Sequence, residues 1–190
     1  MESITGIIKP DIDFKVEEAN EEQINGQSVL ARVEGQFFVP DGKSRNRRLY
    51  PRSLWEKAIK KKAVLEKLES KTMYGTIGHT QPLDDNAILE GKVSHIVTKL
   101  YIDETGRGVG EALVLDTPAG RVLNTLLRAG SKLYVSSRAK GKFKGTKDGM
   151  PVVDEDNYHM KTFDFVVDPG FLEANPELKE SYENLAEKDY

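Results

Sequence analysis

Residues 133–141 of the chain read LYVSSRAKG, and the prediction of both fold and function depends on the role of this stretch. Leu133, Tyr134 and Val135 are typical of a β-strand. Two serines follow, and then a basic segment that contains Gly141. The serine pair is either polar filling within a strand or the end of a strand that presents a nucleophile. The choice depends on which other residues the chain can bring beside it.

The composition indicates a soluble chain with one core. Its 190 residues suggest a single domain, long enough to bury a sizeable core. Charged residues make up 31% of the chain, but the net charge of −3 argues against a general polyanion binder. The absence of cysteine excludes disulfides, a cysteine nucleophile and cysteine-ligated zinc, and it fits a reducing compartment. We expect no secretory signal and no membrane span, because no apolar run approaches the roughly 20 residues required.

The hydrophobic pattern predicts more strands than helices. The expected strands are residues 28–39, 72–79, 87–102, 108–116, the stretch with the two serines, 151–153 and 160–169. The expected helices are residues 53–69 and 117–130. Most connections suit antiparallel pairing, so we expect an α+β fold: an antiparallel β-barrel or strongly curved sheet flanked by helices.

Capping signals mark where both helices begin. Ser53 and Glu56 have capping-box spacing, which predicts Ser53 as the first N-cap. Thr117 followed by Pro118 predicts the second helix start, and Gly130 its end.

The chain divides into three expected parts. Residues 1–26 are acidic and weakly patterned, and we interpret them as an N-terminal arm. Residues 27–172 form the folded domain, within which residues 141–150 are expected to be a flexible basic loop. Residues 173–190 are a polar C-terminal tail.

Three histidines are the first candidates for chemistry. His79 follows a glycine at the expected end of a strand, whereas His95 lies mid-strand, on the expected polar face, and is interpreted as structural. His159 is undecided. A lone histidine is more often structural than catalytic. No histidine or carboxylate spacing suggests a metal site, so we expect neither a metal nor a cofactor.

A serine nucleophile requires partners. Its hydroxyl is inert until a base removes the proton, and the base works best when a third group fixes its tautomer. His79 ends one expected strand, Ser136 lies on another, and Asp164 lies within the last. Spacing alone does not establish this combination.

Two basic clusters offer a different interpretation, in which the chain binds nucleic acid. They are Arg45, Arg47 and Arg48, and then Arg138, Lys140, Lys142, Lys144 and Lys147. Such runs are more often solvated faces, and the net negative charge argues against nucleic acid as a partner.

Four segments, taken together, resemble the prohead (capsid-maturation) serine proteases of tailed bacteriophages, particularly the branch of large myoviruses. They are SRNRRLYPRSLWEKAI at 44–59, GTIGH at 75–79, RAGSKLYVSSRAKG at 128–141 and FDFVVDP at 163–169. The chain is more distantly similar to herpesvirus assemblin. The resemblance implies that residues 27–172 are a serine protease domain with the fold of these proteases.

The resemblance also implies roles for particular residues. The family's histidine corresponds to His79, its nucleophile to Ser136, and its acidic residue in the last strand to Asp164. Assemblin uses a second histidine in the third place, so His159 remains a rival, and Asp168 is a weaker one. The oxyanion-hole amides are not identified, although the loop after Ser136 is expected to leave room for substrate and to supply donors.

The implied function is an endopeptidase that cleaves scaffold and major capsid proteins inside an assembling procapsid, in the host cytoplasm, without a cofactor. Self-cleavage is also implied, and Glu180 and Glu187 in the tail match the glutamate preference of the resembled branch. The alternatives are a catalytically silent scaffold or shell-binding protein of the same fold and a nucleic-acid-binding capsid component. Whether the protein forms a homo-oligomer stays open.

Overall fold

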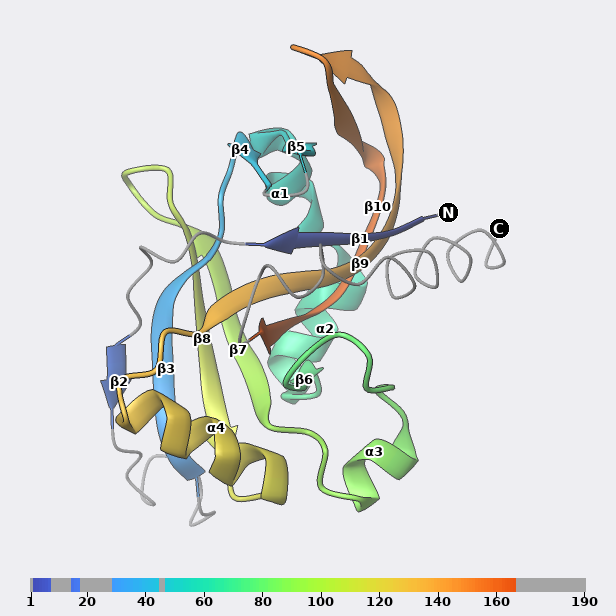
Figure 1. Ribbon diagram of the computed structural model, residues 1–190. Coiled ribbons are helices and arrows are strands. Elements are labelled where there is room, and N and C mark those ends of the chain that lie inside the picture. The colour runs from blue at the N-terminus through green and yellow to red at the C-terminus, as the bar shows by residue number, and fades with distance from the viewer. Residues whose placement is uncertain (1, 8–14, 18–28, 45–46, 167–190) are drawn as a thin grey trace.

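A computed structural model describes residues 2–7, 15–17, 29–44 and 47–166 (Figure 1). The strands are β1 Glu2–Ile7, β2 Lys15–Glu17, β3 Val29–Phe38, β4 Gly42–Lys43, β5 Leu49–Tyr50, β6 Tyr74–Gly75, β7 His95–Ile102, β8 Gly108–Leu115, β9 Tyr134–Lys147 and β10 Met150–Val166. The helices are α1 Arg52–Ala58, α2 Lys62–Ser70, α3 Asp85–Leu89 and α4 Pro118–Arg128.

Within the part of the chain that the structure describes, the strands form two five-stranded sheets. One has the order β1-β9-β10-β5-β4 and the other β2-β3-β8-β7-β6. Pairing is antiparallel except between β10 and β5 and at an isolated bridge from Ile77 to Phe165. Bulges interrupt the β9–β10 ladder, as is common where a sheet bends. The structure is therefore the expected α+β fold of curved antiparallel sheet with helices.

Aromatic side chains join the sheets to α1. Phe163 of β10 lies 5.7 Å from Phe37 and 6.0 Å from Phe38, measured between ring centroids. Trp55 of α1 lies 4.7 Å from Phe38. All four residues are buried, and aromatic pairs in this range add to the free energy of burial. The cluster anchors β10 at Phe163, the residue next to Asp164.

The expected helix at 53–69 is two helices, α1 and α2, and its start was wrong. Pro51, not Ser53, is the N-cap of α1. The first helical N–H, that of Arg52, donates to the side chain of Asp41 at 2.8 Å, while Glu56 accepts from the Arg52 side chain at 2.7 Å. The long-range contact to Asp41 replaces the expected capping box.

The second expected helix is confirmed as α4. The hydroxyl of Thr117 accepts a hydrogen bond from Gly120 N at 2.9 Å, and Pro118 occupies the first turn. Gly130 follows the helix with φ of 80°, the left-handed conformation that favours glycine after a helix.

Two other expectations were wrong. Residues 87–102 are not one strand, because Asp84 accepts a hydrogen bond from Ala87 N at 2.9 Å and caps the short helix α3 before β7. Residues 141–150 are not a flexible loop, because β9 and β10 continue as a paired hairpin (Figure 1). Asp148 and Gly149 have φ of 53° and 76°, as a type I′ hairpin turn requires.

Part of the expected N-terminal arm pairs with the sheets. β1 lies antiparallel to β9 and β2 lies antiparallel to β3. The other residues of 1–26 and the tail at 173–190 lie outside the described residues. Within the described residues, no helix is long and apolar enough to cross a membrane.

Candidate active site

The site is built on the β9–β10 ladder. Ser136 of β9 and Asp164 of β10 are direct cross-strand partners. Directly opposed residues of an antiparallel pair project from the same face of a sheet. The next pair along, Ser137 and Phe163, therefore projects from the opposite face. Strand register alone thus separates the two serines and places only Ser136 beside the aspartate.

His79 lies between these two side chains. Its Nε2 is 2.7 Å from Ser136 Oγ, and its Nδ1 is 2.7 Å from Asp164 Oδ2. A carboxylate accepts only, so Nδ1–H donates to Asp164 and Nε2 is left to accept the proton of the serine hydroxyl. All three residues are buried. This geometry fits a nucleophile, a general base and a group that orients the base.

The segment that carries His79 is fixed to β10 by its backbone. Gly78 N donates to Phe165 O at 2.7 Å, and Phe165 N donates to Thr76 O at 3.2 Å. Gly78 has φ of 82°, which other residues rarely adopt, so a glycine is needed where the chain turns toward His79. The glycine of GTIGH thus has a local structural reason.

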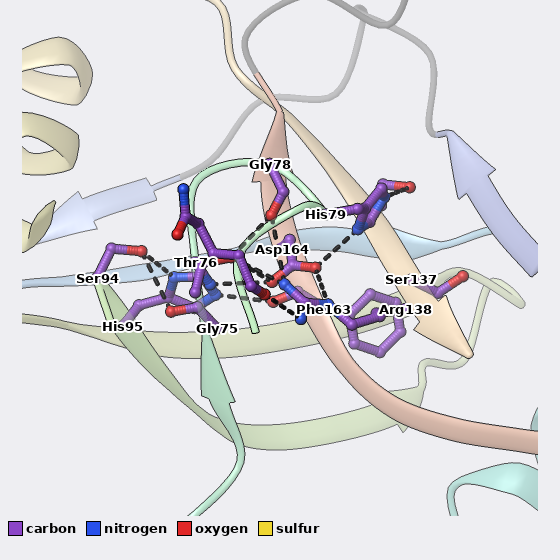
Figure 2. A network of polar contacts seen from close by, with 12 residues as sticks. Gly75, Thr76, Gly78, His79, Ser94, His95, Ser137, Arg138, Phe163 and Asp164 are labelled. Atoms are coloured by element: carbon purple, nitrogen blue, oxygen red, sulfur yellow. Dashed lines mark hydrogen bonds and ion pairs between the residues drawn. The ribbon is translucent and has the colours of Figure 1, made fainter. Parts of the chain in front are cut away.

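Asp164 is surrounded by donors (Figure 2). Its Oδ1 accepts from Thr76 N at 2.9 Å, while Oδ2 accepts from His79 Nδ1 and from Arg138 Nε, each at 2.7 Å. Burial alone would raise the pKa of Asp164, but its contacts with His79 and the Arg138 guanidinium hold that pKa below the ordinary value. The carboxylate is therefore ionised and fixed in orientation at neutral pH.

With this geometry established, comparison with known proteins identifies the family. The sequence matches the family described as prohead core protein serine protease over residues 3–183. The chain belongs to this family. It is 28% identical over 131 residues to the prohead core protein protease of Enterobacteria phage T4. That match covers 65% of this chain and 57% of the T4 protein, so the chain spans little more than half the length of this curated relative.

A solved structure supports the fold of this prohead protease family member. The bacteriophage T4 capsid assembly protease matches with a TM-score of 0.63 at 22% identity, over 87% of this chain and 99% of that chain. The likeness confirms the fold expected from the sequence.

Of the alternatives to Asp164 as the partner of His79, His159 lies away from the site. His159 is exposed and pairs with Lys140 rather than with Ser136, and its Nδ1 lies 3.4 Å from Lys61 Nζ. Burial and the charge of Lys61 lower the pKa of His159. Asp168 lies outside the described residues. Of the two described candidates, only Asp164 contacts His79.

His95 was expected on a polar strand face, and this was wrong. It is buried at the start of β7, with Nε2 2.8 Å from Phe163 O and Nδ1 2.8 Å from Ser94 Oγ. Burial lowers the pKa of His95, so it is neutral, with Nε2–H donating to the carbonyl and Nδ1 accepting from the hydroxyl. The structural interpretation of His95 fits these contacts, since it supports the residue that precedes Asp164.

Sequence reasoning missed Thr76 and Arg138 as parts of the site. Arg138 was grouped with an exposed basic cluster, yet its side chain is only 12% exposed and binds Asp164. A signal for it was present, because residues two apart on a strand share a face and Arg138 is two residues after Ser136. In the other cluster, the Arg48 guanidinium lies 5.1 Å from the centroid of the Phe143 ring. Both arginines therefore have contacts within the protein.

The described residues hold no group of three or more histidine, aspartate or glutamate side chains arranged to bind a metal. The reactive groups that the site brings together are the hydroxyl of Ser136, the imidazole of His79 and the carboxylate of Asp164.

Proposed function

We propose that this chain is a serine endopeptidase of phage prohead maturation, with Ser136 as nucleophile, His79 as general base and Asp164 as the orienting carboxylate. The observation that carries the proposal is the position of His79, whose two ring nitrogens each lie 2.7 Å from one of the other two residues. Membership of the prohead protease family supports the reaction class.

The geometry supports acyl transfer in two steps. As Ser136 Oγ attacks the scissile carbonyl carbon, His79 Nε2 takes the hydroxyl proton and then gives it to the departing amine. The acyl group is left as an ester on Ser136. Water then attacks the ester, His79 takes a proton from the water, and the proton returns to Ser136 Oγ as the acid product leaves. Asp164 stays ionised throughout and stabilises the imidazolium.

Burial adds a requirement for substrate entry. Ser136 is 0% exposed and His79 is 4% exposed. A peptide bond therefore reaches the hydroxyl only after part of the chain around Ser136 moves, and such opening commonly accompanies substrate binding in enzymes.

The names of the relatives support a proposal for the substrates. One is named a prohead core protein protease and the other a capsid assembly protease, both from phage T4. We infer that this chain cleaves the scaffold and major capsid proteins of its own phage inside the assembling procapsid, in the host cytoplasm, and that it also cleaves itself.

The test compares wild type with Ser136→Ala. Each protein is incubated with the scaffold and major capsid proteins of the same phage, and the products are measured by intact mass. Wild type is expected to generate defined fragments, while Ser136→Ala generates none. Equal cleavage by both would reject Ser136 as the nucleophile. No cleavage by either, together with binding of scaffold, would favour the catalytically silent scaffold-binding protein.

A further inference from the structure

Arg138 reaches four acceptors with one planar group. Its Nε donates to Asp164 Oδ2 at 2.7 Å, one terminal nitrogen donates to Gln81 O at 2.7 Å, and the other donates to Thr76 Oγ1 at 2.8 Å. The second terminal nitrogen also lies 3.4 Å from Gly78 O. The Arg138 side chain is only 12% exposed, so these contacts are largely shielded from water.

These acceptors belong to two segments of the chain. Asp164 is on β10, whereas Thr76, Gly78 and Gln81 flank His79 in the segment after β6. Arg138 itself is on β9, two residues from Ser136. One guanidinium therefore ties together the three segments that carry the proposed nucleophile, base and carboxylate (Figure 2).

We propose that Arg138 is a positioning residue for the peptidase reaction: its guanidinium holds the Asp164 carboxylate and the His79 segment in the one arrangement that aligns His79 with Ser136. This inference rests on the proposed function.

In this proposal, Arg138 prevents rotation of the Asp164 carboxylate. Thr76 N holds Oδ1, but Oδ2 must face His79 for the imidazole tautomer to be fixed. Arg138 Nε binds this same Oδ2. Its rigid fork makes the contact directional, which the single ammonium of a lysine does not reproduce.

A positioning role for Arg138 and an effect of its positive charge on His79 predict opposite changes in rate when Arg138 is removed. Arg138 and His79 bind the same carboxylate oxygen, so the guanidinium charge lies close to the imidazole. A cation there opposes formation of the imidazolium. If charge were its main effect, removing Arg138 would help His79 to accept a proton. If positioning dominates, removal slows the reaction.

The experiment measures kcat and KM for cleavage of the phage's scaffold protein by wild type, Arg138→Ala and Arg138→Lys. Misplacement of a catalytic group by 1 Å can cost about 100-fold in rate, so we expect kcat of Arg138→Ala to fall by about that factor while KM changes little. Arg138→Lys should recover only part of the loss. Lys144→Ala is the control, because it removes one positive charge from the exposed part of the same strand and should retain wild-type kcat.

The pH profile gives a second readout. The charged or titratable groups that act on the Asp164 carboxylate are His79, Arg138 of β9 and His95 of β7. The acidic limb of the kcat profile reports the coupled pair of the proposed base and its carboxylate, not Asp164 alone. Because the Arg138 guanidinium, together with His79, helps to hold the pKa of Asp164 below its ordinary value, removal of Arg138 should move this limb to higher pH. A purely structural role would lower the amount of folded protein without moving this limb.

Folded Arg138→Ala with kcat within about threefold of wild type would overturn the inference, since a positioning residue should cost far more. A loss confined to KM would overturn it as well. If Arg138→Ala does not fold, Arg138→Lys decides by the same criteria. Failure of the proposed function looks different, because wild type itself then leaves the scaffold protein intact, and the inference falls with it.

Discussion

Ser136 and Asp164 face each other across the β9–β10 ladder, and His79 reaches both from a different segment. The positions of the proposed nucleophile and the proposed orienting carboxylate are thus set by the register of one strand pair, whereas the proposed base lies in the segment after β6. If β9 slipped by one residue against β10, Ser137 would lie opposite Asp164 and would share its face of the sheet, while Ser136 would project from the opposite face. The aromatic packing of Phe163, next to Asp164, opposes such a slip.

The two serines should differ in their effect on cleavage. Ser136→Ala is expected to abolish cleavage, because Ser136 is the serine whose hydroxyl lies 2.7 Å from His79 Nε2. Ser137→Ala should keep a substantial part of the activity. It should lose about 1 kcal/mol of unfolding free energy, because the buried hydroxyl of Tyr158 loses its acceptor at 3.2 Å. Full activity in Ser136→Ala would contradict the assignment of the nucleophile.

Asp164→Asn should impair turnover far more than His159→Ala. In the chymotrypsin-type triad the same change costs about 10⁴ in kcat, because the amide no longer holds the correct imidazole tautomer. His159 lies exposed beside Lys61, so its removal should leave kcat near wild type. The reverse ranking of the two variants would indicate the assemblin arrangement of two histidines.

Sequence predicted the strand that carries the serines, and the resemblance supplied the three residues that the structure brings together. The sequence did not predict the contact between Arg138 and Asp164, because the two residues lie on different strands and are 26 positions apart. The start of α1 was missed for the same reason, since the cap contact with Asp41 spans 11 residues. The β9–β10 hairpin was missed although its Asp148-Gly149 turn is a local signal.

Asp164 should make the stability of the folded protein depend on pH in the acidic range. Its pKa in the folded protein lies below the ordinary value of 3.8. Its ionised contacts therefore stabilise the fold above that ordinary value, and this contribution is lost as pH falls through the lowered pKa. Thermal unfolding of wild type and Asp164→Asn between pH 7 and pH 2 should show a large difference at neutral pH that narrows in acid. A constant difference over this range would contradict the ionised, contact-stabilised carboxylate.

Gly75→Ala should damage the support beneath the site. A Cβ at this position would overlap the His95 ring and lie 2.6 Å from Phe163 O, the pair that hydrogen-bonds there. Overpacking of this kind costs about 2 kcal/mol, so we expect a clear fall in the melting temperature. Cleavage should fall as well, because Phe163 precedes Asp164. Wild-type stability and activity in Gly75→Ala would show that His95 is not needed to hold β10 in place.

Self-trimming in the tail is the last expected outcome. The resembled branch cuts after glutamate with a small or aliphatic residue two positions before it, and segments 178–180 and 185–187 read LKE and LAE. Both lie outside the described residues, in a stretch of the sequence rich in polar residues, and proteases cleave extended, accessible chain most readily. We expect wild type at high concentration to end at Glu180 or Glu187, while Ser136→Ala stays full length to Tyr190. Intact mass measures this directly, and Glu180→Gln with Glu187→Gln should keep the wild-type tail whole without lowering cleavage of scaffold protein. A wild-type tail that stays intact while scaffold is cleaved would reject self-trimming and leave the peptidase proposal standing.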